Sequence, residues 1–233
     1  MILAERLGKR YGLRPVLRGV SLQVARGEFV AVLGANGAGK TTLLRILATL
    51  TRPDAGALWI GGVDALRHPE RVRQQIGLVS HHSLVYGELT AAENLRFYGW
   101  LYGLRGDALE RRIEEALRQM DLWSRRHDRA RTFSRGMTQR LTIARALLHD
   151  PAVLLLDEPF TGLDQGAAAT LSSLLREAAL EGRAVIMTTH EIHRGLEGVT
   201  RALILRDGQI VHEQRDDLAP QLLAALLHDH ANA

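Results

Sequence analysis

The segment Gly34-Ala-Asn-Gly-Ala-Gly-Lys-Thr41 constrains the fold more than any other part of the chain, and it directly follows a largely apolar segment at 28–33. The spacing G-x-x-x-x-G-K-[ST] binds phosphate when it joins a buried strand to a helix, and an apolar helical pattern follows at 40–49. The glycines let backbone N–H groups point at an anion, and the helix N-terminus adds partial positive charge. The sequence therefore predicts a phosphate-binding loop in an α/β protein, a P-loop NTPase.

Lys40 and Thr41 give this loop its expected chemistry. Only two of the 30 basic residues are lysines, Lys9 and Lys40, so a lysine at this position stands out. Lys40 is expected to reach the β- and γ-phosphates of ATP, and the Thr41 hydroxyl to bind Mg²⁺. The predicted nucleotide contacts are Gly34, Ala35, Asn36, Gly37, Ala38, Gly39, Lys40, Thr41 and Thr42.

Two acidic residues are expected to complete the site from the end of another buried strand. The apolar run at 153–156 ends in Asp157 and Glu158. A P-loop needs a carboxylate at the end of a neighbouring strand to hold Mg²⁺, and Asp157 fits that role. Glu158 is then placed to polarise the attacking water as a general base.

Apolar runs alternate with helical patterns, which indicates a largely parallel sheet. Thr90-Ala-Ala-Glu93 predicts a capping box at one helix start. We expect one domain, 1–233, with an antiparallel β edge near the N-terminus and a helical subdomain at about 90–135 inserted in the core. Expected strands are 20–24, 28–33, 57–60, 76–80, 153–157, 184–188, 202–206 and 209–212, and expected helices are 40–49, 90–102, 107–121, 136–149, 166–180 and 218–227.

Composition excludes several other classes of protein. No apolar run approaches the roughly 18 residues that cross a bilayer. The first eleven residues carry four charges, so we expect no signal peptide there. The absence of cysteine excludes disulfide and thiolate chemistry. Any membrane role is therefore expected to come through a partner.

Phe133-Ser-Arg-Gly-Met137, followed by Gln139 and Arg140, stands ahead of the acidic strand. With the phosphate loop and Asp157-Glu158, this ordered set resembles the nucleotide-binding subunits of ABC transporters. The resemblance implies an ABC-type ATPase core that pairs head to tail around two ATP molecules. It implies that Ser134 and the Gly136 N–H contact the γ-phosphate held by the partner. Arg135 and Met137 depart from the usual Leu-Ser-Gly-Gly-Gln.

Three further residues match the family in order. The resemblance implies that Tyr11 stacks on adenine and that Asp164, in Thr161-Gly-Leu-Asp164, lies in the loop linking the two sites. It also implies that His190 contacts the γ-phosphate and helps Glu158, so that Glu158, His190 and Lys40 form the catalytic set. The family's glutamine after the strand at 76–80 is missing, and His81, or alternatively His82, takes its place.

The segment 81–103, together with 133–137, most resembles the haem-exporter ATP-binding subunit of cytochrome c biogenesis. The resemblance implies integral-membrane permease subunits and a second ATPase subunit as partners, at the cytoplasmic face of the cell membrane. The second subunit is expected to be another copy, with a paralogue as the alternative. Exporters of drugs, lipids or polysaccharides stay open, as does an ABC ATPase acting on ribosomes or DNA. No nucleic acid is expected, because the arginines at 125–135 have no interleaved aromatic residues beyond Trp123 and Phe133.

Overall fold

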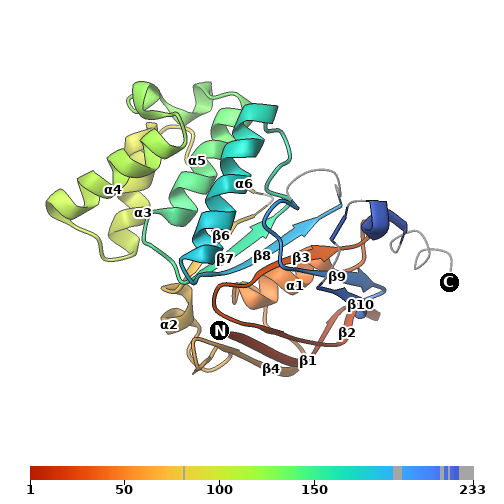
Figure 1. Ribbon diagram of the computed structural model, residues 1–233. Coiled ribbons are helices and arrows are strands. Elements are labelled where there is room, and N and C mark those ends of the chain that lie inside the picture. Colours follow the sequence, from red (N-terminus) through yellow and green to blue (C-terminus); the bar gives the residue numbers. More distant parts are fainter. Residues whose placement is uncertain (81, 191–195, 216–217, 220, 226–233) are drawn as a thin grey trace.

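A six-stranded sheet in the order β10-β9-β3-β8-β7-β6 forms the centre of the molecule (Figure 1). The computed structural model describes residues 1–80, 82–190, 196–215, 218–219 and 221–225. All neighbouring strands of this sheet are parallel except the edge strand β10, which pairs antiparallel with β9. Its strands are β3 (Phe29–Leu33), β6 (Ile76–Val79), β7 (Val153–Asp157), β8 (Ala184–Thr189), β9 (Arg201–Arg206) and β10 (Gln209–Gln214). β3, β7 and β8 are buried at every residue, which explains their unbroken apolar sequences.

A second, antiparallel sheet has the order β2-β1-β4-β5 and confirms the predicted antiparallel edge. Its strands are β1 (Ile2–Tyr11), β2 (Arg14–Val24), β4 (Ala55–Ile60) and β5 (Val63–Asp64). Our expectation missed β1 and gave only the second half of β2. The reason lies at Arg6, which has a φ of 47° where the register of β1 shifts. Glu5 and Arg6 are consecutively exposed, and this breaks the alternating pattern of a strand.

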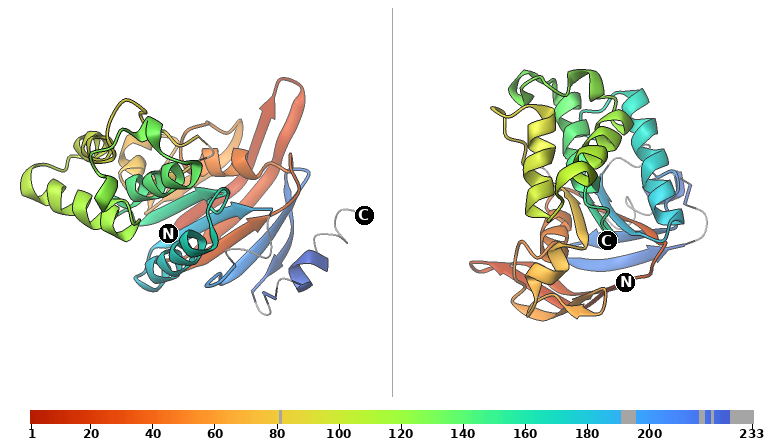
Figure 2. Two further views of the ribbon diagram at one scale, coloured as in Figure 1. Left: turned by 90° about the horizontal axis from the view of Figure 1, so that it is seen from above. Right: turned by 90° about the vertical axis from the view of Figure 1, so that its left-hand side faces the viewer.

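Helix α1 (Lys40–Leu47) lies between the two sheets, and its apolar residues share a core with both. The other large helices are α3 (Ala91–Leu101), α4 (Gly106–Gln119), α5 (Arg135–Leu147) and α6 (Gln165–Leu180), with the 3₁₀ turns η1 (Trp123–Arg125) and η2 (Ala130–Thr132) before α5. α5 and α6 pack on the opposite face of the six-stranded sheet, and α3 and α4 pack on α5 (Figures 1 and 2). The short helix α2 (Pro69–Arg73) was not expected, because five residues carry too little periodicity.

The predicted capping box is present at the start of α3. The Glu93 backbone N–H donates to the Thr90 hydroxyl, and the Thr90 N–H donates to the Glu93 carboxylate. Of the predicted helix at 218–227, residues 221–225 are helical and several of the others lie outside the described residues. Within the described part of the chain, no helix has the length and apolar character needed to cross a bilayer.

His149 joins α5 to β6 and to the end of α3. Its Nε2 donates to the Ile76 carbonyl at 3.1 Å, and its ring stacks on Tyr102 with a centroid separation of 3.5 Å. The buried Nδ1 has no hydrogen-bond partner among the described atoms. Burial lowers the pKa of His149 to about 4, and the neighbouring Arg145 cation acts in the same direction, while the bond to Ile76 and the charge of Asp150 oppose it.

His149 is expected to make the fold sensitive to acid. A histidine whose folded pKa is depressed is neutral when folded but charged when unfolded, so stability is full above pH 6.5 and is lost toward pH 4. The loss can reach about 1.4 kcal/mol per pH unit in that window. Chemical denaturation at several pH values measures it. His149→Phe should reduce the dependence of the unfolding free energy on pH while keeping a ring stacked on Tyr102. His127→Phe, at an exposed position, should leave that dependence unchanged. Equal slopes in all three proteins would contradict the prediction.

Candidate functional site

The phosphate loop connects the end of β3 to the start of α1, as the motif predicted. A Cβ at Gly34 would lie 2.3 Å from the backbone oxygen of Leu205, so no other residue fits without moving β9. Gly39 has a φ of 108°, and its Cβ position is 2.9 Å from the Leu17 side chain. Glycine at both places lets the loop lie tightly on its neighbours and turn its N–H groups outward.

Lys40 extends from the first turn of α1 back into this loop. Its Nζ donates to the carbonyl oxygens of Gly34 at 2.7 Å and Ala35 at 3.2 Å, and lies 3.9 Å from Glu158 Oε1. Burial lowers the pKa of the Lys40 ammonium from its usual value, although the carboxylates of Glu158 and Asp157 act in the opposite direction. The Lys40 side chain is 7% exposed, so the loop holds a positive charge that is largely shielded from solvent.

Asp157 ends β7 directly beside the first turn of α1. Its Oδ1 accepts hydrogen bonds from the Thr41 hydroxyl at 3.2 Å and the Thr188 hydroxyl at 2.6 Å. The buried carboxylate and two hydroxyls form a compact set of hard oxygen atoms, which is the donor set that Mg²⁺ prefers. Asp157 and Thr41, the predicted metal residues, therefore lie together and fit the metal.

Glu158 follows and faces both the lysine and the expected histidine. Its Oε2 lies 2.9 Å from His190 Nδ1, and its Oε1 is the oxygen near Lys40. The Glu158 N–H donates to the backbone oxygen of Thr188 at 3.1 Å, which fixes the turn after β7 to the end of β8. The carboxylate thus stands between a cation and an imidazole, 21% exposed, with access to water.

Ser134, Gly136 and Asp164 lie on the helical side of the molecule. Ser134 is the N-cap of α5, and its Oγ accepts from the Met137 N–H; Asp164 is the N-cap of α6, and its Oδ1 accepts from the Ala167 N–H. A cavity of 590 Å³ is lined both by the start of α5 and by the Asp157–Glu158 turn, with Ser80, Phe133, Arg135 and Thr161 among its walls. Within the described residues, no hydrogen bond or ion pair joins Ser134, Gly136 or Asp164 to the phosphate loop of the same chain.

Tyr11 and His81 complete the predicted set. Tyr11 ends β1, is 51% exposed, and lies near Lys9, whose Nζ is 5.7 Å from the ring centroid. An exposed ring of this kind is available for stacking. His81 lies outside the described residues. The alternative His82 is described and lines the 590 Å³ cavity.

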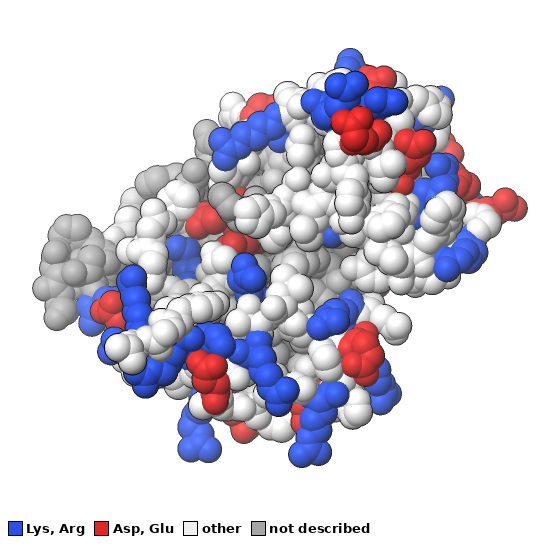
Figure 3. Space-filling model, turned by 180° about the vertical axis from the view of Figure 1, so that it is seen from behind, with Lys and Arg blue, Asp and Glu red and all other residues white. Residues whose placement is uncertain are grey.

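Two residues at the site were missed from the sequence. Thr188 holds Asp157 and Glu158 in place, and the only signal was a threonine ending a buried strand. Arg14 lines a 190 Å³ cavity with Gly34–Ala38 and residues 204–207. It had no signal, because nothing in the sequence brings the start of β2 to the loop. On the face seen in Figure 3, Lys and Arg gather over the lower part, where the four-stranded sheet lies, and this favours an anionic ligand.

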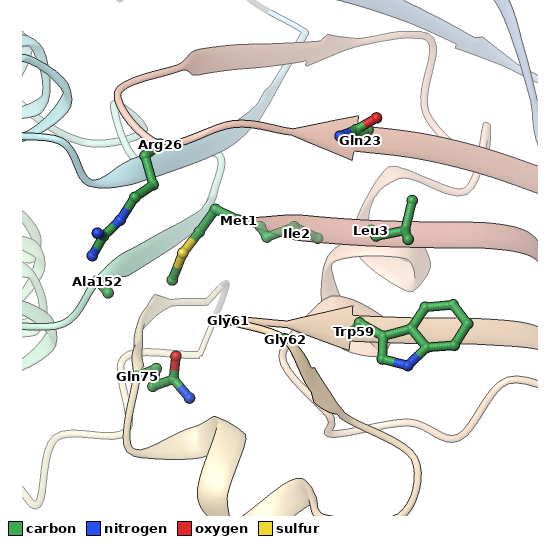
Figure 4. A pocket seen from close by; sticks show the side chains of 10 residues that line it. All are labelled: Met1, Ile2, Leu3, Gln23, Arg26, Trp59, Gly61, Gly62, Gln75 and Ala152. Atoms are coloured by element: carbon green, nitrogen blue, oxygen red, sulfur yellow. The ribbon is translucent and has the colours of Figure 1, made fainter.

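A different cavity, of 720 Å³, opens near the amino ends of the parallel strands, at the far end of the six-stranded sheet from the phosphate loop (Figure 4). Met1, Trp59, Gln75 and Ala152 are among its lining residues. Ala152 precedes β7, whereas Asp157 ends it, so this cavity lies at the amino ends of the parallel strands. Ligands of open α/β sheets bind at the carboxyl ends, where the phosphate loop is.

Comparison with known proteins agrees with this geometry. The family model described as "ABC transporter" matches residues 17–161. The ATP-binding protein NatA of Bacillus subtilis is 35% identical over 84% of this chain and 80% of its own length. The daunorubicin resistance ATP-binding protein DrrA3 of Streptomyces coeruleorubidus is 39% identical over 90% of this chain, which spans only 66% of that relative.

Solved structures show the same fold. A structure of the ATP-binding subunit of an ABC transporter has a TM-score of 0.90 at 30% identity, with both chains fully covered. The dimeric ATP-binding cassette MJ0796, in a post-hydrolysis state with ADP and phosphate, has a TM-score of 0.86 at 28% identity, covering 92% of this chain and 98% of that one. With the loop, the acidic turn and the helical side in their places, the chain belongs to the ABC transporter family, as an ATP-binding and ATP-hydrolysing subunit.

Proposed function

We propose that this ATPase works as one half of a nucleotide-sandwich dimer that drives the membrane subunits of an exporter. The observation that carries the proposal is the continuous chain of contacts at the carboxyl ends of β3, β7 and β8. It joins Lys40, Glu158 and His190 on one side, and Thr41, Asp157 and Thr188 on the other. Phosphate binding, metal binding and water activation thereby meet at one point.

In this proposal the phosphates of ATP lie on the N–H groups of the loop and on Lys40. Phosphate oxygens replace the Gly34 and Ala35 carbonyls as acceptors of the ammonium, which then stabilises the charge developing on the transferred phosphoryl group. Glu158 accepts a proton from the attacking water, and His190, at 2.9 Å, orients the carboxylate. The structure gives these side chains the proximity that such roles require.

Thr41 and Asp157 are the residues that we propose to hold Mg²⁺. When bound, the metal supplies positive charge against the β- and γ-phosphates. Thr188 would keep the Asp157 carboxylate oriented, because it donates the shorter of the two hydrogen bonds that Oδ1 receives. Orientation of a ligating carboxylate by a second hydrogen bond is a common requirement at metal sites.

The second copy follows from the position of Ser134, Gly136 and Asp164 away from the chain's own phosphate loop. A partner turned head to tail would bring these residues to the other nucleotide, and the dimeric relative MJ0796 supports that arrangement. We expect Glu158→Gln to be monomeric alone and dimeric with MgATP, because the nucleotide binds to both subunits and favours the closed state. Size-exclusion chromatography with light scattering measures this. A monomer under both conditions would argue against the sandwich.

Export is proposed from the relatives. The sequence resemblance favoured haem export in cytochrome c biogenesis, but DrrA3 is named for daunorubicin resistance, and the relatives named above lend haem no support. We therefore propose export with the cargo left to the permease, because an ATPase subunit does not touch it. The proposed location is the cytoplasmic face of the membrane that holds the permease.

A mild-detergent pull-down from native membranes, followed by mass spectrometry, tests the transport role. A multi-span permease should be recovered. Cytochrome c maturation components would restore the haem assignment, and a different permease would identify another exporter. Ribosomal proteins or nucleic acid without a membrane protein would overturn the transport role and leave the ATPase intact.

A further inference from the structure

Arg135 stands where the family usually has glycine, and its side chain crosses to the segment that follows Glu158. A Cβ built on Gly162 would lie 2.9 Å from Nε, 3.0 Å from Cδ and 3.1 Å from Cγ of Arg135. Gly162 has a φ of 81°. The glycine therefore provides both the left-handed turn and the space that the arginine stem occupies.

Two further contacts join the first turns of α5 to the same segment. Gln139 Nε2 donates to the Pro159 carbonyl at 2.8 Å, and the Cβ position of Gly136 lies 3.3 Å from the Gly162 oxygen. Pro159 is the next residue after Glu158, and the Thr161 N–H donates to the backbone carbonyl oxygen of Glu158. The turn that carries the hydrolytic carboxylate is thus supported from one side by the end of β8 and from the other by α5.

The charge of Arg135 does not explain its position. The neighbouring arginines Arg125, Arg129, Arg131 and Arg140 each form an ion pair with a carboxylate. Among the described residues, no carboxylate forms an ion pair with Arg135. Its placement therefore depends on the packing of the aliphatic stem over the bare backbone of Gly162, a mode in which long basic side chains often contribute.

We propose that Arg135 is a positioning residue for hydrolysis: its stem, packed over Gly162, fixes residues 159–162 and so holds Glu158 in place. The inference rests on the proposed function, because it assumes Glu158 as general base. Ser134 and Gly136, on either side of Arg135, are the residues proposed to meet the partner's nucleotide. Closure of the dimer on that nucleotide would thereby press the stem against the segment that carries the subunit's own base.

Four variants separate the stem from the charge. Arg135→Ala and Arg135→Gly remove the stem, whereas Arg135→Met and Arg135→Lys keep its length. We expect kcat to fall about tenfold in the first pair, because small displacements of a catalytic group are costly. The ATP concentration at half-maximal rate should stay within twofold, and the second pair should stay near wild type. Steady-state kinetics measure both quantities, and thermal unfolding checks that each variant is folded.

Arg131→Ala and Arg131→Met are the matched controls. Arg131 is exposed, lies three residues before Ser134 and pairs with Glu88. Both control variants should keep wild-type kinetics. If Arg135→Met loses as much activity as Arg135→Ala while Arg135→Lys retains it, the charge acts and the proposal is wrong. Wild-type kinetics in all four Arg135 variants would also overturn it.

A double-mutant cycle with Gly162→Ala tests the contact itself. The added methyl would collide with the stem, so Gly162→Ala should lower kcat in the wild type more than in the Arg135→Ala background. Additive losses would overturn the proposal. Placing Arg135→Ala in the Glu158→Gln background distinguishes this failure from failure of the proposed function. The Arg135→Ala/Glu158→Gln double variant should still form a dimer with MgATP. If the Glu158→Gln single variant forms no dimer with MgATP, the sandwich model itself is wrong.

Discussion

Glu158→Gln is expected to lower ATP turnover by about 10³-fold while leaving ATP binding intact, because removal of a general base costs about 10² to 10⁴ in rate. Glutamine keeps the size of the side chain and its contacts, but it cannot accept the proton of water. The neighbours that hold the position are unchanged: Lys40 at 3.9 Å, His190 at 2.9 Å and the backbone of Thr188. The loss should therefore lie in kcat.

Phosphate release under single-turnover conditions, together with a binding assay for ATP, measures the two effects separately. Glu114→Gln, on the exposed side of α4 and paired with Arg118, is the matched control and should keep full activity. Equal turnover in Glu158→Gln and the wild type would show that another group activates the water. A parallel loss of ATP affinity would show that Glu158 organises the loop instead.

Lys40→Met is expected to weaken both ATP binding and ATP hydrolysis. The variant removes the buried cation of the phosphate loop, and a hydrogen bond to a charged group of this kind contributes roughly 1.5–3 kcal/mol. ATP affinity should fall about 10- to 100-fold. Turnover should fall by about 10³-fold, because the charge developing on the phosphoryl group loses its nearest protein cation.

Lys40→Arg should not restore activity. The ammonium lies between the Gly34 and Ala35 carbonyls in a space that is 7% exposed, and a planar guanidinium is larger. Arg118→Met, on the exposed surface of α4, provides a control for the loss of one positive charge. Titration calorimetry and an ATPase assay are sufficient. Binding of ATP at wild-type affinity by Lys40→Met would contradict the assignment of the loop.

The sequence indicated which residues of the candidate site lie together where those residues are consecutive. The loop after β3 and the acids after β7 each lie at the end of a short apolar strand, and parallel strands bring such ends to one edge. Thr188 and Arg14 could not be found in this way. Their roles depend on contacts between distant segments, and a threonine or arginine alone indicates neither.

The fold was predictable for the buried strands and the long helices, where a single period dominates. β1 was missed because a register shift at Arg6 interrupts the alternation of buried and exposed residues, although the strand pairs on both sides. The Arg135 contact was unpredictable for a related reason. The departure from glycine was visible, but only the structure places the stem over Gly162.

Glu158 has a φ of 50°, a conformation that glycine adopts freely and that costs other residues about 1–2 kcal/mol. The chain therefore keeps its proposed base at a position where the backbone would relax if the side chain were absent. Replacement by glycine would raise the free energy of unfolding but remove the proposed general base. Selection for heat resistance alone would therefore favour a variant at this residue that no longer hydrolyses ATP. Laboratory evolution of this ATPase toward thermostability should accordingly include selection for hydrolysis at every round.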